Sequence, residues 1–143
     1  MELRIIEHGS VFYQKMVELR TEILRKPLGL EYTEAQLAAE KSDLLLVATE
    51  NNQVIGCSIL TPLENNQIQL RQMAVAKDQQ GNGMGAKIVI FAEKMAVEKG
   101  FRTLVLHARK YAVGFYQNLG YQTFGDEFVE VGIPHFSMRK ELV

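Results

Sequence analysis

The stretch MAVAKDQQGNGMGA, residues 73–86, decides the fold, because a strand ends there in a glycine-rich loop that opens a helix. Gly81, Gly83 and Gly85 alternate along this loop, and an ordinary turn into a helix does not need so many glycines. The first backbone N–H groups of a helix lack partners within it and lie at the positive end of its dipole. The stretch is therefore typical of a site that binds phosphate groups.

Two common phosphate-binding motifs do not explain this loop. Residues 81–86 fit the dinucleotide pattern G-x-G-x-x-G/A, but no acidic residue follows the next strand, where residues 106–109 read LHAR. Residues 67–73 alternate polar and apolar side chains, unlike the doubly buried strand of a dinucleotide fold. The P-loop pattern fails as well, because Lys87 lacks the glycine before it and the hydroxyl residue after it. A glycine-rich turn without a ligand is the plain alternative.

The composition is that of an ordinary globular protein and narrows the partners. The 143 residues carry a net charge of −1, which creates no field that would gather nucleic acid or acidic lipid. The only cysteine, Cys57, can form neither a disulfide framework nor a cysteine metal site within the chain. The N-terminal residues do not resemble a signal peptide, and no apolar window reaches the roughly 20 residues that span a bilayer. We expect a cytoplasmic protein with no metal, nucleic-acid or membrane partner.

Hydrophobic periodicity and turn residues predict one mixed α/β (α+β) domain over residues 1–143. The expected order is β-α-α-β-β-β-α-β-α-β-β, over residues 3–6, 10–26, 33–41, 44–49, 54–60, 67–75, 84–99, 103–107, 111–119, 121–124 and 136–139. Helix 84–99 connects two strands expected to be parallel. Gly56 within its strand indicates a bulge or a close backbone approach.

Two motifs together resemble the GNAT superfamily of acetyl-CoA-dependent N-acetyltransferases. The segment QGNGMG, residues 80–85, matches the superfamily signature Q/R-x-x-G-x-G/A. Downstream, AVGFYQNLGY at residues 112–121 is similar to its second motif, A-x-x-F-Y-x-x-x-G-F/Y, and the tail GIPHF at residues 132–136 is similar to one bacterial subgroup. The element order fits over nearly the whole chain, so the resemblance implies a GNAT-like acyl-CoA N-acyltransferase fold.

The resemblance also implies a coenzyme A site, with acetyl-CoA as the co-substrate. The strand backbone at Met73, Ala74 and Val75 would meet the pantetheine arm, and one N–H there would face the acetyl carbonyl. The pyrophosphate would lie on the loop formed by Gln80, Gly81, Asn82, Gly83, Met84, Gly85 and Ala86. Gln80 stands where relatives often carry arginine.

Three residues are candidates for the proton transfers. The family register implies that Tyr116 protonates the leaving thiolate, whereas helix spacing alone would put both Phe115 and Tyr116 in the core. We leave Phe115 in the core. His107 and His135 are each candidates for the base that accepts the proton of the amine, or for ordinary structural hydrogen bonding.

The sequence therefore predicts an N-acetyltransferase that transfers acetyl to the primary amine of a small molecule or peptide. A non-catalytic domain of the same fold that binds or senses acyl-CoA is the alternative. By strand alternation, one of Arg71 and Gln72 should face the acceptor. The family also suggests a homodimer.

Overall fold

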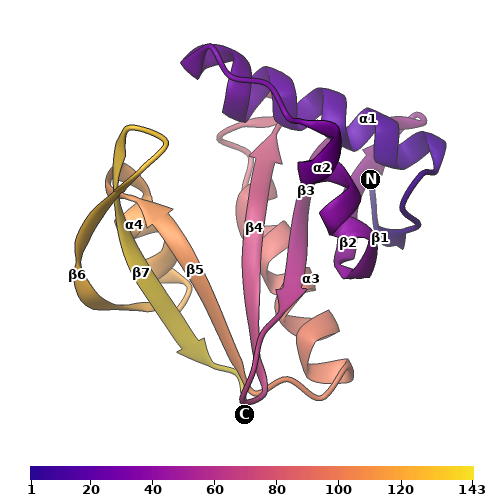
Figure 1. Cartoon of the computed structure of the whole chain (residues 1–143). Coiled ribbons are helices and arrows are strands. Elements are labelled where there is room, and N and C mark those ends of the chain that lie inside the picture. The colour runs from indigo at the N-terminus through magenta and orange to yellow at the C-terminus, as the bar shows by residue number, and fades with distance from the viewer.

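The computed structural model describes residues 1–143 and contains one seven-stranded sheet of order β1-β2-β3-β4-β5-β7-β6 (Figure 1). The strands are β1 (Glu2–Ile6), β2 (Leu44–Glu50), β3 (Gln53–Pro62), β4 (Gln67–Val75), β5 (Thr103–Arg109), β6 (Gln122–Glu130) and β7 (Ile133–Glu141). The α-helices are α1 (Val11–Arg20), α2 (Glu34–Ala38), α3 (Met84–Glu98) and α4 (Val113–Asn118). Short 3-10 or π turns extend α1 and α2 and precede α3 and α4. This order confirms the predicted fold class.

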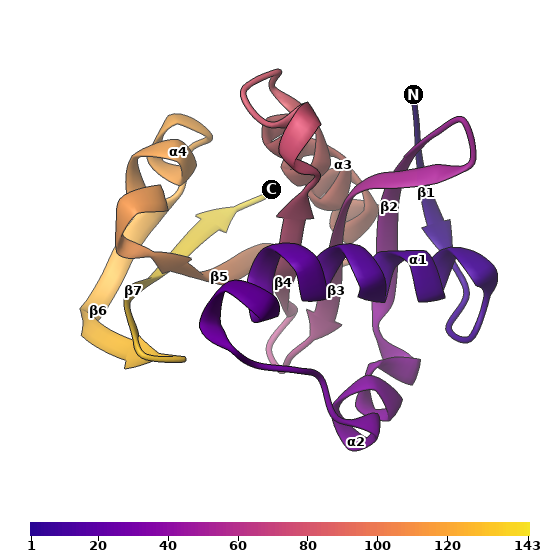
Figure 2. The ribbon, with the colours of Figure 1, turned by 90° about the horizontal axis from the view of Figure 1, so that it is seen from above.

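Helices cover both faces of the sheet, as Figures 1 and 2 show. On one face, Tyr13 and Met16 of α1 pack against β2, β3 and Ala74 of β4. On the other face, α3 and α4 pack on β4, β5 and β7 through a larger core that includes Val89 and Tyr116. Hydrophobic burial on both faces holds the sheet between its helices.

Gly56 lets α3 come close to the sheet. A Cβ atom at this position would lie 2.6 Å from Ile88 Cδ1, which is closer than van der Waals contact allows. The register between β2 and β3 also shifts next to it, between Ala48 and Thr49. The bulge predicted as one alternative from this glycine is therefore confirmed, and the atom that comes close to it belongs to the Ile88 side chain.

Strand β4 is parallel to β5, whereas the other neighbouring strands are antiparallel. The two strands pair only over their first halves, with Gln67 opposite Thr103 and Leu70 opposite Leu106. Beyond Leu70 they diverge, which is visible in Figure 1. The divergence leaves the carboxyl ends of the two parallel strands apart from each other.

A β-bulge at Gln72 changes the alternation of side chains along β4. Residue Gln72 has φ 55°, in the left-handed region that few non-glycine residues adopt. The pairing with β3 shifts at the same point, so that Cys57 faces Ala74 while Ile59 faces Arg71. As a result Arg71 and Gln72 line the same cavity, whereas in a regular strand two successive side chains point to opposite faces of the sheet.

The final hairpin of β6 and β7 is longer than predicted. Nearly all of β6 is exposed, so the strand lacks the apolar alternation on which the prediction relied. A register shift between Phe124 and Phe128, with Gly125 at φ 73°, interrupts the pattern further. Among the helices none is long and apolar enough to cross a membrane; α3, the longest, has 15 residues.

Candidate active site

The divergence of β4 from β5 leaves one edge of β4 open. Residues 71–75 have no pairing with β5, and on the opposite edge Ala74 pairs with Cys57 and Val75 with Gly56 of β3. Backbone N–H and C=O groups on the edge of residues 71–75 that faces away from β3 therefore have no strand partner, although the carbonyl oxygen of one residue, Val75, accepts from the Gln80 side chain. An extended molecule that carries amide groups can pair with such an edge as an added strand. The predicted residues Met73, Ala74 and Val75 lie along this open edge.

The loop after β4 presents backbone amides that have no partner. No amide from residue 81 to residue 86 donates a hydrogen bond within the chain, and no side chain caps α3. Gly81 and Gly83 have φ values of 83° and 77°, which a side chain would strain, so glycine is required for this loop shape. Amides that point free from the start of a 15-residue helix suit an anion such as a pyrophosphate.

Two residues of the loop have contacts that the sequence does not predict. The side chain of Gln80 turns back, and its Nε2 donates to the carbonyl oxygen of Val75 at 2.9 Å. At Gly85, a Cβ atom would lie 3.2 Å from Phe115 Cζ, so this glycine allows α4 to approach the first turn of α3. The Phe115 side chain is 36% exposed, and our expectation that it belongs to the core is wrong. Phe115 instead packs beside the free amides.

The phenol of Tyr116 lies between α4 and the open edge of β4. Its hydroxyl has one hydrogen-bond partner, Met73 Sδ at 4.0 Å, and the ring packs edge-on against Phe115 and Tyr121. Burial raises the pKa of Tyr116 to about 12, with a smaller contribution from Tyr111. The phenol therefore stays protonated at neutral pH and has no oxygen or nitrogen acceptor that competes for its proton.

His107, Glu130 and His135 form a cluster on β5, β6 and β7. The carboxylate of Glu130 lies between the two rings, 3.1 Å from His107 Nδ1 and 3.7 Å from His135 Nε2. His107 is partly exposed, and its Nε2 has no partner, whereas the buried His135 uses Nδ1 to bond the carbonyl oxygen of Ile133 at 2.7 Å. Glu130 belongs to no sequence motif and was not among the predicted site residues. Its carboxylate contacts Nδ1 of His107 and leaves the other ring nitrogen free.

A cavity of about 170 Å³ lies beside the bulge of β4, on the side of the sheet that α1 covers. Its lining includes Arg25, Tyr32, Gln36, Glu40, Arg71 and Gln72. The hydroxyl of Tyr32 donates to Gln72 Oε1 at 2.6 Å, and Arg25 lies over the Tyr32 ring at 4.6 Å. Because Gln72 directly precedes Met73, the cavity adjoins the open edge of β4.

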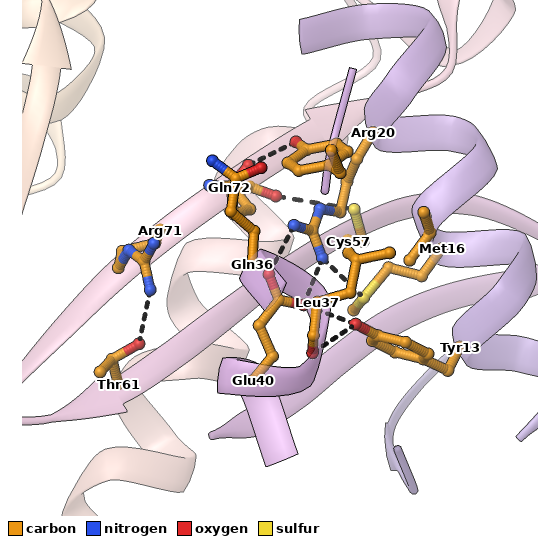
Figure 3. Close-up of polar contacts among 12 residues, drawn as sticks. Tyr13, Met16, Arg20, Gln36, Leu37, Glu40, Cys57, Thr61, Arg71 and Gln72 are labelled. Carbon is orange, nitrogen blue, oxygen red and sulfur yellow. Dashed lines mark hydrogen bonds and ion pairs between the residues drawn. The ribbon is translucent and has the colours of Figure 1, made fainter. Parts of the chain in front are cut away.

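A buried ion pair supports the floor of this cavity (Figure 3). The guanidinium of Arg20 donates to both carboxylate oxygens of Glu40, at 2.8 and 2.7 Å, and the Tyr13 hydroxyl donates to one of them at 2.8 Å. Burial alone would raise the pKa of Glu40, but the hydrogen bonds and charge of Arg20 outweigh it and hold that pKa below its usual value. Glu40 is therefore charged, with its oxygens already engaged. No cluster of three or more His, Cys, Asp or Glu residues is arranged to hold a metal ion.

Comparison with known proteins agrees with this geometry. A family model described as an acetyltransferase (GNAT) domain matches residues 13–142. The uncharacterized protein YyaT of Bacillus subtilis is 36% identical over 112 residues, which cover 78% of this chain and 74% of YyaT. The chain belongs to the GNAT family of acetyltransferases, which confirms the enzyme class inferred from residues 80–85 and 112–121.

Solved structures show the same fold at low sequence identity. An acyl-CoA N-acyltransferase from Pseudomonas aeruginosa has a TM-score of 0.84 at 18% identity and covers 97% of this chain and 98% of its own. A GNAT family acetyltransferase from Elizabethkingia anophelis, solved with acetyl-CoA bound, has a TM-score of 0.74 at 20% identity, with 98% and 97% covered. The overall fold of this chain is thus one that these solved structures share.

Proposed function

We propose that this N-acetyltransferase transfers the acetyl group of acetyl-CoA directly to a primary amine of a small molecule or peptide, with residues 1–143 acting as one domain. The observation that carries the proposal is the open edge of β4 followed at once by unpartnered amides at the start of α3. The edge suits the amide-bearing pantetheine arm, and the amides suit the pyrophosphate. Acetyl-CoA bound to the Elizabethkingia anophelis protein of the same fold supports this cofactor.

The proposed cofactor site follows the chain from strand to helix. It consists of Met73, Ala74, Val75, Gln80, Gly81, Asn82, Gly83, Met84, Gly85 and Ala86. Backbone groups carry most of the binding, so side-chain changes here act mainly through the shape of the loop. Since Gln80 already bonds Val75, its role in this proposal is to hold the loop against the end of β4.

The reaction requires one proton to leave the amine and one to reach the sulfur. Attack by the neutral amine forms the C–N bond and breaks the C–S bond, whose electron pair stays on sulfur. Tyr116 Oη, protonated at neutral pH, donates to that sulfur, and a backbone N–H on the open edge of β4 stabilises the developing oxyanion. Acetyl-CoA supplies the activated thioester that makes the carbonyl carbon electrophilic.

Of the two histidines, His107 is the better candidate for the base. Glu130 engages its Nδ1, so Nε2 is free to accept the proton of the attacking amine. His135 is buried, and its Nδ1 is held by Ile133, which supports a role in positioning Glu130.

A cytoplasmic location and a homodimer are also part of this proposal. The location is supported by Cys57, the only cysteine, which is buried and free. The homodimer, which the family suggests, stays a prediction that light scattering can test.

Calorimetric titration with acetyl-CoA, followed by thiol release with a broad amine panel, tests the proposal. We expect Tyr116→Phe to lower kcat by about 10²-fold with unchanged acetyl-CoA affinity, because it removes the proton donor and little else. Tyr111→Phe is the matched control, since Tyr111 is 80% exposed and makes only the smaller contribution to the raised pKa of Tyr116, so this change should lower kcat far less. Failure to bind acetyl-CoA would refute the proposal. Tight binding without turnover of any amine would favour the non-catalytic acyl-CoA-binding alternative.

A further inference from the structure

More arginine than carboxylate side chains line the cavity beside the β4 bulge. Arg25 and Arg71 both line it, and neither takes part in a salt bridge. Arg71 Nη1 donates to Thr61 Oγ1 at 3.2 Å. The guanidinium has five N–H donors, and the other four have no hydrogen-bond partner within the chain. The Cζ atom of Arg25 lies over the Tyr32 ring, 4.6 Å from its centroid, which is a cation–π contact for this guanidinium.

The acidic groups near the cavity are already engaged. Glu40 is the one carboxylate in the lining, and Arg20 and Tyr13 bond both of its oxygens (Figure 3). Asp43 also interacts with Arg71, but it lies outside the lining of the cavity. An incoming ammonium group would therefore meet two arginines and no free carboxylate.

We infer that the acceptor amine carries an anionic group, a carboxylate or a phosphate, and that Arg71 and Arg25 bind this group. The inference rests on the proposed function, because the cavity serves an acceptor only if the thioester lies on the neighbouring edge of β4. Arginine matches both anions through paired N–H donors. Gln72 lies between Arg71 and Met73, so an anion held at Arg71 leaves the amine of a short molecule close to the open edge.

The size of the cavity limits what else the acceptor can be. A volume of about 170 Å³ has room for roughly five or six water molecules, which matches the head of an amino acid or an amino phosphate. A polyamine fits poorly, because its further ammonium groups would meet Arg25 and Arg71. The size and the two arginines of the cavity thus indicate a small acceptor that carries both an amine and an anionic group.

Matched pairs of amines test this inference. The pairs are L-leucine with isoamylamine, L-phenylalanine with phenethylamine, γ-aminobutyrate with butylamine, and phosphoethanolamine with ethanolamine. Thiol release measures kcat/KM for each, and calorimetry measures binding of each to the enzyme in the presence of coenzyme A. We expect at least one member that carries an anionic group to exceed its partner without that group by about 10- to 100-fold, the range for a charge-assisted hydrogen bond. Comparison of the three carboxylate pairs with the phosphoethanolamine pair then identifies which anion is preferred.

Two variants assign the preference to the cavity. We expect Arg71→Gln to remove most of that preference while acetyl-CoA affinity and melting temperature stay unchanged. Arg102→Gln is the control, because Arg102 is exposed, forms no salt bridge and precedes β5 at the opposite end of the sheet. The inference is overturned if the amines without an anionic group are turned over equally well or better, or if no member with an anionic group binds. It is also overturned if Arg71→Gln keeps the preference intact. Acetyl-CoA binding in the same experiments shows whether the proposed function still stands.

Discussion

Removal of the Glu40 carboxylate should strongly destabilise the protein, because Arg20 would then keep a buried charge without a partner. Arg20 is 0% exposed and donates two hydrogen bonds to Glu40. Breaking one side of such a buried pair costs about 3–5 kcal/mol of the free energy of unfolding. Unfolding entropy is about 2.1 cal/mol/K per residue, or about 0.3 kcal/mol/K for 143 residues. We therefore expect Glu40→Ala to lower Tm by roughly 10–17 °C.

The loss should depend on pH in a defined direction. The pKa of Glu40 is lowered in the folded protein, so its contribution to stability is present above the ordinary glutamate pKa of about 4.3. That contribution disappears as the pH falls through the lower pKa of the folded state. The difference in unfolding free energy between wild type and Glu40→Ala should thus narrow below about pH 4 and stay constant from pH 6 to 8.

Chemical denaturation across this pH range measures the effect, with Glu22→Ala as the control. Glu22 pairs with Lys26 at 3.5 Å on the exposed surface, where a salt bridge contributes at most about 1 kcal/mol. The double variant Arg20→Met, Glu40→Leu should recover much of the loss, since it removes both buried charges together. A Glu40→Ala deficit below about 1 kcal/mol, or one that does not change down to pH 3, would refute the reasoning.

Two further predictions concern single side chains near the site. His107→Gln should lower kcat/KM by about 10²-fold without changing acetyl-CoA affinity, because it removes the group proposed to accept the proton of the amine; an unchanged kcat/KM, measured by thiol release, would exclude His107 as the base. Burial raises the pKa of Cys57 to about 12, so this thiol stays protonated and shielded at pH 8. A thiol reagent should label Cys57 only as fast as the protein unfolds, and rapid labelling of the native protein would contradict its burial.

The order of strands and helices could be predicted from sequence because the signals are local. Ser10 and Thr33 accept hydrogen bonds from the amides three residues on, as their positions before apolar periodic segments predict. The glycine spacing in residues 81–85 likewise reflects a local backbone requirement, which the positive φ values of Gly81 and Gly83 confirm. Such features depend on neighbours within a few residues, which is the range that a sequence pattern covers.

The contacts that assemble the site depend on residues distant in sequence. Arg20 and Glu40 read as ordinary surface charges on two helical segments, yet they form a buried pair. Glu130 lies on an exposed edge strand without a motif, and it reaches His107 only because β7 pairs with both β5 and β6. The Phe115 position was predicted wrongly because helix periodicity does not reveal which side of a short helix remains open to solvent.

The sequence by itself determined the fold class and the acetyl-CoA donor, because the glycine loop and the Phe-Tyr motif are local patterns that together resemble the GNAT superfamily. The tertiary structure adds the cavity lined by Arg25 and Arg71, on which our proposal for the acceptor half rests. The bulge at Gln72, which no residue type announces, turns both Arg71 and Gln72 toward one cavity. The buried Arg20 also pairs with Glu40, the carboxylate in the lining of the cavity. The charge of the cavity therefore follows from packing between helices and not from composition.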